Sequence, residues 1–222
     1  MTSKKSDQKL FFDVLDKKRL KILPRLEFLR RDYGFYLAGG TALALQIGHR
    51  KSIDFDFYTA GDFDPKDLFR KFKTIFKNIA STHMAEGTLM AAIDDIEVSF
   101  FRYDYPLLNP LVELEYIDLS SLEDIAAMKV IAVVQRGTKR DFVDIFYLLK
   151  IFRLREMLEF TARKYSVFNE YIGLRALTYF EDAERDRSRR RLETFEKIRW
   201  DKIKKDIIDL VGKYTKERIP KR

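Results

Sequence analysis

The chain has 222 residues, no cysteine, two histidines and a formal net charge of +8. These values exclude a disulfide framework, a thiolate metal site and a multi-histidine zinc site, and they leave carboxylates as the metal ligands to consider. No apolar run approaches the length of a membrane span, and no signal-peptide core follows the first residues. We therefore expect a cytoplasmic protein with no membrane partner.

The first predicted elements lead into the most informative stretch of the chain. Residues 8–31 predict a helical lead-in that is broken near Pro24. The stretch from Phe35 to Tyr58 follows and reads FYLAGGTALALQIGHRKSIDFDFY. Its apolar start predicts a short strand over residues 35–38.

A glycine pair comes directly after this strand. Gly39 and Gly40 permit unusual backbone angles and close approach of a ligand. Thr41 is a suitable N-cap for a short helix, and Gly48 suits the position just past its end. Because free amides at a helix N-terminus attract anions, the turn is a candidate phosphate site, although Gly-Gly before a helix is often only a tight turn.

Two carboxylates follow on the next predicted strand, at residues 53–58. Asp54 and Asp56 alternate with phenylalanines, so both acids share one face of the strand. Neighbouring carboxylates raise each other's pKa unless a cation lies between them. Mg²⁺, held by carboxylates and substrate phosphates, would remove this conflict. Alone, the pair also fits a solvated strand edge. The combination with the glycine turn favours an enzyme that handles a nucleoside triphosphate and Mg²⁺ or Mn²⁺.

The remaining pattern predicts an α+β chain, a mixed sheet with helices followed by a helical domain. We expect a helix at 65–79, a hairpin at 87–102 that turns at Asp94-Asp95, and a strand at 112–117. Ser120 to Glu123 resembles a capping box, and the pattern is helical from there, interrupted at 136–138. The predicted domains are therefore 1–118 and 119–222.

Charged residues at helical spacing occur early in the predicted helical domain. Lys129 and Arg136 are seven positions apart and share a helix face, and Arg140 and Asp144 are four apart on the next helix. These groups could face the carboxylate strand across an interdomain cleft, where sites often lie. The ordinary alternative is a surface ion pair and a lysine that extends from a packed helix.

The stretch GGTALALQIGHRKSIDFDF resembles the signature of the AbiEii/AbiGii toxin nucleotidyltransferases, within the polymerase-β-like nucleotidyltransferase superfamily. A second block, LEDIAAMKVIAVVQRGTKRDFVDIFYLLK at 122–150, resembles the later motifs of the same family. The resemblance implies a polymerase-β-like core, a toxin–antitoxin or abortive-infection role, a tRNA or other RNA 3′ end as acceptor, and a cognate antitoxin as partner.

The same resemblance implies roles for individual residues. The nucleotide would be bound by Gly39, Gly40, Thr41, Arg50 and Ser52. The catalytic residues would be Asp54, Asp56, Lys129, Asp141 and Asp144.

One departure from the pattern concerns the third acid of such sites. Nucleotidyltransferases of this superfamily usually carry a third carboxylate on a neighbouring strand. That strand here reads IEVSFF, with Ser99 at one position of the relevant face and Glu97 at another. Metal binding is therefore expected from Asp54 and Asp56, with Glu97 as a third candidate ligand.

The excess positive charge lies in the last third of the chain. Residues 150–222 hold 21 Lys and Arg against 13 Asp and Glu, so the first 149 residues are neutral. Basic tracts bind phosphate backbones, and Arg189, Arg190 and Arg191 are candidate RNA contacts. The alternative is a solvated helix whose charges pair locally.

These observations predict a Mg²⁺-dependent nucleotidyltransferase that transfers a nucleotide to an acceptor hydroxyl with release of pyrophosphate. Two other hypotheses stay open. One is modification of a protein hydroxyl, although the Gly-Ser-x-Ala-Arg-Gly turn usual in such enzymes is replaced here by Gly39-Gly40-Thr41-Ala42-Leu43. The other is a non-catalytic RNA-binding protein with a decayed site, which Ser99 suggests.

Overall fold

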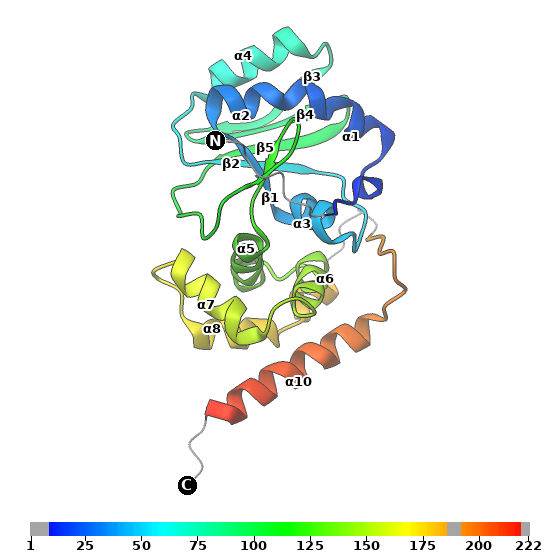
Figure 1. The fold of residues 1–222 in the computed structure, drawn as a ribbon, viewed down its shortest axis with the longest axis vertical. Coiled ribbons are helices and arrows are strands. Elements are labelled where there is room, and N and C mark those ends of the chain that lie inside the picture. Colours follow the sequence, from blue (N-terminus) through cyan, green and yellow to red (C-terminus); the bar gives the residue numbers. More distant parts are fainter. Residues whose placement is uncertain (1–8, 186–191, 219–222) are drawn as a thin grey trace. The chain divides into compact units, whose positions relative to one another are not determined.

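The computed structural model describes residues 9–185 and 192–218. The chain divides into two compact units, Met1–Ser121 and Leu122–Arg222, called unit 1 and unit 2 below. Unit 1 is a seven-stranded mixed sheet with helices, and unit 2 contains the later helices (Figure 1). The predicted α+β class is confirmed.

The sheet of unit 1 has the order β3-β4-β5-β2-β1-β7-β6. Strand β2 pairs antiparallel with β1 and parallel with β5, and β1 pairs parallel with β7. The carboxylate-bearing strand is therefore central in the sheet. The strands are β1 (Tyr36–Ala38), β2 (Phe55–Thr59), β3 (Ile79–Ala85), β4 (Thr88–Ile93), β5 (Ile96–Arg102), β6 (Val112–Glu113) and β7 (Asp118–Leu119).

Helices cover both faces of this sheet (Figure 1). Helices α2 and α4 lie over one face, and α3 lies on the other. The helical elements of unit 1 are η1 (Phe12–Val14), α1 (Lys17–Ile22), η2 (Leu23–Leu26), α2 (Glu27–Tyr33), α3 (Gly39–Ile47) and α4 (Pro65–Ile75).

An aromatic core joins α2 and α4 to the sheet. The rings of Phe57 and Phe100 stack at a centroid distance of 5.5 Å, and Phe72 of α4 contacts Phe100 at 5.1 Å. Phe28 of α2 reaches Phe72 at 5.2 Å. Each aromatic pair adds about 0.5–1.5 kcal/mol beyond the burial of its area. The phenylalanines that alternate with the acids of β2 therefore anchor this strand.

Several predicted boundaries hold, and others, including the start of β2 at Phe55 rather than at residue 53, do not. Asp94 and Asp95 have positive φ in the turn between β4 and β5, which confirms the predicted hairpin. Helix α4 ends at Ile75 rather than at residue 79, because Phe76 is extended and its buried ring packs on Phe72. The predicted strand over 112–117 is instead two short strands, β6 and β7.

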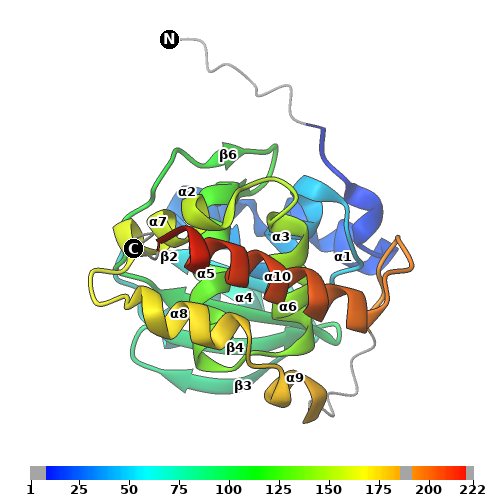
Figure 2. The same cartoon turned by 90° about the horizontal axis from the view of Figure 1, so that it is seen from below.

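Unit 2 is built around α5, which contacts α6, α7 and α8. This helix is apolar on most faces, as a central helix must be. Helix α10 packs along α6, α7 and α8 (Figure 2). The helices are α5 (Leu122–Gln135), α6 (Lys139–Leu148), α7 (Leu154–Lys164), α8 (Glu170–Leu177), α9 (Glu181–Arg185) and α10 (Trp200–Arg218). None of the helices in the described residues is long and apolar enough to span a bilayer.

Candidate active site

The glycine turn forms the N-terminus of α3. The helix begins at Gly39, whose φ of +66° lies in the region that glycine tolerates, and the preceding Ala38 offers no capping side chain. The sequence prediction that Thr41 is the N-cap is wrong, since Thr41 lies inside the first turn. Gly48 ends the helix in a left-handed conformation, as predicted. Amides of this first turn, with the positive end of the helix dipole, suit a phosphate.

The Asp56 carboxylate lies against this turn. Ala38 is the register partner of Asp56 across the β1–β2 pair. A Cβ atom placed on Gly39 would be 3.4 Å from Asp56 Oδ2. This distance is that of an ordinary van der Waals contact, so the turn and the Asp56 carboxylate are close neighbours, and it is the backbone angle that favours glycine at position 39.

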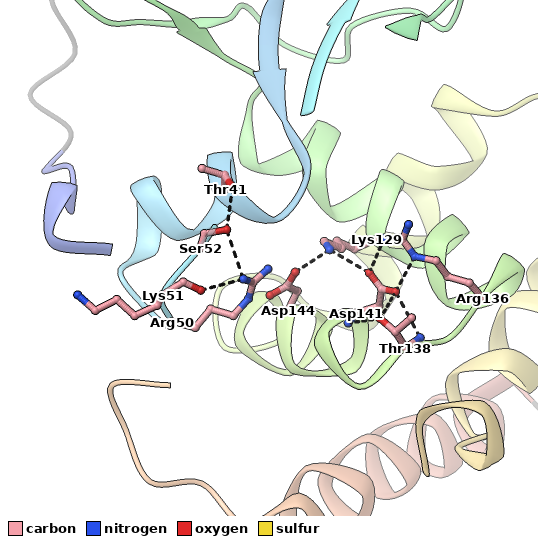
Figure 3. Close-up of polar contacts among 9 residues, drawn as sticks. All are labelled: Thr41, Arg50, Lys51, Ser52, Lys129, Arg136, Thr138, Asp141 and Asp144. Carbon is pink, nitrogen blue, oxygen red and sulfur yellow. Dashed lines mark hydrogen bonds and ion pairs between the residues drawn. The ribbon is translucent and has the colours of Figure 1, made fainter. Parts of the chain in front are cut away.

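A hydrogen-bond network fixes the segment that precedes β2 (Figure 3). The Thr41 hydroxyl donates to the backbone carbonyl of Asp54 and lies 2.7 Å from Ser52 Oγ. Arg50 Nη1 donates to the Lys51 carbonyl at 3.1 Å and to Ser52 Oγ at 3.5 Å. Thr41 therefore joins α3 to the acidic strand through its side chain, a role that the sequence analysis missed because the two groups are thirteen positions apart.

The sheet carries a serine, not an acid, beside Asp56 on the neighbouring strand. Ser99 on β5 is the register partner of Asp56, and Glu97 is an exposed residue two positions earlier on the same face. Within the parts of the chain that the structure describes, no three His, Cys, Asp or Glu side chains form a group that could hold a metal ion. Glu97 therefore does not complete a carboxylate trio with Asp54 and Asp56. Two carboxylates still fit Mg²⁺, which commonly takes one or two of them together with substrate phosphates and water.

In unit 2, the predicted Lys129 is held by two acids of α6 (Figure 3). Lys129 Nζ lies 3.0 Å from Asp141 Oδ1 and 2.6 Å from Asp144 Oδ2. The side chains of both acids are at most 1% exposed. The Lys129 ammonium and the carboxylates of Asp141 and Asp144 thus form a buried charged cluster between α5 and α6. Replacing any one of the three by a neutral side chain would change the net charge of this cluster.

Asp141 also has a structural role at the start of α6. It forms a capping box with Thr138, whose hydroxyl donates to Asp141 Oδ2 at 2.7 Å. Arg136 donates to both oxygens of Asp141, at 2.9 and 3.1 Å. Burial by itself would raise the pKa of the Asp141 carboxyl, but Lys129 and Arg136 hold this pKa well below its ordinary value.

A second buried ion pair was not predicted from the sequence. Lys164 Nζ of α7 lies 2.7 Å from Asp124 Oδ1 of α5, and both side chains are fully buried. The α5·α7 contact is among the most extensive in unit 2. The sequence signal was an acid in a largely apolar helix, which does not reveal a partner forty positions away.

Some of the basic side chains of unit 2 pair locally with acids. Lys204 Nζ lies 2.7 Å from Glu184, Lys202 Nζ lies 2.7 Å from Asp206, and Arg218 pairs with Glu170. The predicted RNA contacts Arg189, Arg190 and Arg191 lie outside the described residues.

Comparison with solved structures defines the class of fold. A putative nucleotidyltransferase from H. pylori superposes with a TM-score of 0.60, at 18% identity, over 96% of each chain. The antibiotic-resistance factor ANT(2'')-Ia superposes with a TM-score of 0.51, at 10% identity, over 66% of this chain and 91% of its own. At these identities, the likeness is one of fold.

The sequence comparisons supply the family. The family described as "Nucleotidyl transferase AbiEii toxin, Type IV TA system" matches residues 21–111 and 108–219. The chain belongs to this family and is a nucleotidyltransferase. A relative from Aquifex aeolicus (strain VF5), described as an uncharacterized protein, is 36% identical over 178 residues, which is 78% of this chain and 86% of its own.

Proposed function

We propose that this nucleotidyltransferase moves a nucleoside monophosphate from a nucleoside triphosphate to the terminal hydroxyl of an RNA, with tRNA as the first candidate, in a Mg²⁺-dependent reaction. The observation that carries the proposal is the closeness of Gly39, at the start of α3, to the Asp56 carboxylate. It brings an anion-binding helix N-terminus beside a carboxylate that suits a hard cation.

The groups of the turn supply the nucleotide site in this proposal. The first-turn amides of α3 bind the phosphates, and the network of Thr41, Ser52 and Arg50 keeps the acidic strand in place beside them. A divalent cation held by Asp54 and Asp56 would neutralise charge on the phosphates and lower the pKa of an attacking hydroxyl. The acceptor oxygen then forms a bond to the α-phosphorus, pyrophosphate leaves, and the hydroxyl proton passes to solvent.

For unit 2, we propose that Lys129 and Asp144 are needed for turnover, as the family resemblance implies. Asp141 has a positioning role, because it holds Lys129 and caps α6. Removal of one group that stabilises a transition state costs on the order of 10²–10³-fold in turnover. The family description also motivates a cognate antitoxin as partner of this chain.

The test is transfer of label from each α-labelled nucleoside triphosphate, with Mg²⁺ or Mn²⁺, to total RNA or to lysate protein. We expect labelled RNA with the wild type and a loss of at least about 10²-fold for Asp56→Asn. The matched control is Asp62→Asn, because Asp62 lies in the same unit and its side chain is 85% exposed. The control should retain wild-type transfer.

Each other outcome points to a different function. Label on protein rather than RNA would assign the enzyme to protein modification. Transfer that survives Asp56→Asn would exclude Asp56 as a metal ligand. The absence of transfer to either acceptor with every nucleotide, together with RNA binding, would indicate a decayed site, which the serine opposite Asp56 allows.

A further inference from the structure

Aromatic side chains continue along the sheet face that carries Asp56. In the sheet register, Asp56 lies between Ala38 and Ser99. The next row on that face consists of Tyr36, Tyr58 and Phe101. The ring centroids of Tyr36 and Tyr58 are 6.3 Å apart, and those of Tyr58 and Phe101 are 5.3 Å apart.

Two tyrosines extend this row beyond the end of β5. Tyr103 contacts Tyr58 at a centroid distance of 5.1 Å, and Tyr105 contacts Tyr103 at 4.9 Å. Tyr36 is buried, whereas Tyr105 is 44% exposed. We call Tyr58, Phe101, Tyr103 and Tyr105 the aromatic ladder. It becomes more accessible toward the end formed by Tyr105.

The ladder and the glycine turn lie on opposite sides of Asp56 along the strand direction. Strand β1 runs antiparallel to β2, with Ala38 opposite Asp56 and Tyr36 opposite Tyr58. Gly39, which follows Ala38, is therefore displaced from Asp56 in the direction away from Tyr58. Tyr58 is two residues beyond Asp56, and at a rise of about 3.3 Å per residue the ladder begins about 7 Å away.

We infer that the aromatic ladder is the binding site for the terminal bases of a single-stranded RNA acceptor. This inference rests on the proposed nucleotidyl transfer. Phosphoryl transfer proceeds in line, so the acceptor hydroxyl enters opposite the leaving pyrophosphate. If the turn holds the phosphates, the ladder lies on the side from which the acceptor enters.

The chemistry of the ladder also favours bases over a protein acceptor. Unpaired bases stack on tyrosine and phenylalanine rings, and this stacking tolerates any base because every base has a π-face. The offset and edge-on rings of the ladder leave Tyr105 as the outermost platform.

The experiment measures binding of a short 5′-labelled single-stranded RNA to the full chain. The variants are Tyr105→Leu, which keeps an apolar side chain without a ring, Tyr105→Phe, which keeps the ring, and Tyr103→Leu. Loss of one stacked base corresponds to an affinity loss of about 5- to 150-fold. We expect this loss for the leucine variants and near wild-type binding for Tyr105→Phe.

A second probe keeps the test independent of folding defects. The same RNA with abasic 3′-terminal nucleotides should bind the wild type more weakly and should bind wild type and Tyr105→Leu equally. The matched control protein is Tyr171→Leu, which alters another exposed tyrosine, 67% exposed and in unit 2. This control should bind the intact RNA as the wild type does.

Three outcomes would overturn the inference. The first is equal affinity of the wild type for intact and abasic RNA. The second is a Tyr105→Leu variant that binds intact RNA as tightly as the wild type. The third is a raised KM for the nucleoside triphosphate with unchanged RNA affinity, which would assign the ladder to the base of the incoming nucleotide. RNA binding needs no catalysis, so these results are separable from failure of the proposed transfer, which Asp56→Asn tests.

Discussion

At the scale of single residues, Gly39 combines an unusual backbone angle with a position beside the Asp56 carboxylate of the proposed site. Its positive φ starts α3, and it is a close neighbour of Asp56 Oδ2. Replacement by alanine therefore has two separable effects. One is the backbone cost of the left-handed region, and the other is a new methyl group against the Asp56 carboxylate beside the proposed phosphate site.

We predict that Gly39→Ala lowers stability by roughly 1–2 kcal/mol, the cost of a left-handed conformation for a residue with a Cβ. Its nucleotidyl transfer should fall by more than the loss of folded protein accounts for. The matched control is Gly34→Ala, since Gly34 has φ +65° but only Thr59 Oγ1 within 4 Å, at 3.8 Å. The control should lose similar stability in denaturant titration and keep its specific activity. Equal activity of the two variants would contradict the role of the Gly39–Asp56 contact.

At the scale of helices, two buried charge clusters hold α5 to its neighbours. Asp124 binds Lys164 of α7, and Lys129 binds the two acids of α6. A buried pair is not by itself a large source of stability, but breaking one by removing a partner is costly, since a charge is left in the interior. The packing of unit 2 therefore depends on the balance of charge in each cluster.

Replacing Lys164 by Met should destabilise unit 2 by about 3–5 kcal/mol, because the Asp124 carboxylate loses its ammonium inside the protein. The double variant Lys164→Met/Asp124→Leu should recover much of this loss. Urea unfolding of the single and double variants measures the coupling. Additive losses in the double variant would show that the pair is not energetically coupled.

The Asp141 carboxyl gives unit 2 a dependence on acid pH. Its pKa in the folded chain lies below its value of about 3.9 in an unfolded chain. Its stabilising contribution is therefore complete above that value and is lost as pH falls through the lower pKa of the folded state. At neutral pH, we expect Asp141→Asn to be less stable than the wild type by about 1.5–3 kcal/mol, the range for a charged hydrogen bond. The difference should shrink below about pH 4. A constant difference would contradict the lowered pKa.

At the scale of the whole molecule, the charge excess of the last third is the remaining sequence signal for RNA. Replacing Arg189, Arg190 and Arg191 together by Ala should weaken RNA binding and flatten its dependence on salt, since each phosphate contact releases counterions. Binding of the nucleoside triphosphate should not change. The measurement is RNA affinity at several salt concentrations, and identical slopes for the two proteins would place the RNA contacts on other residues.

The sequence predicted those parts of the fold that depend on the conformational preferences of neighbouring residues. Gly48 ends α3 and the Asp94-Asp95 turn joins β4 to β5, because glycine and aspartate tolerate positive φ. Alternation predicted that Asp54 and Asp56 share one strand face, but β2 begins at Phe55, so Asp54 lies just before the strand. The Thr41 link to the acidic strand and the Asp124–Lys164 pair were not predictable in this way. They depend on which segments meet in the folded chain, and nothing in the sequence near either residue identifies its partner.

The order of strands has a consequence for the timing of folding. Strand β2, which carries Asp56, lies between β1 and β5, and β1 requires β7 near the end of unit 1. Parallel pairings between segments that are distant in the sequence form slowly, because the entropy of the intervening loop is lost before the stabilising contacts form. During synthesis, the first two strands leave the ribosome well before their outer partners. The carboxylate and its flanking aromatic row can therefore reach their final register only after β5 has emerged, and, with Lys129 and Asp144 needed for turnover as proposed, a growing chain would remain without activity until α6 has also been made.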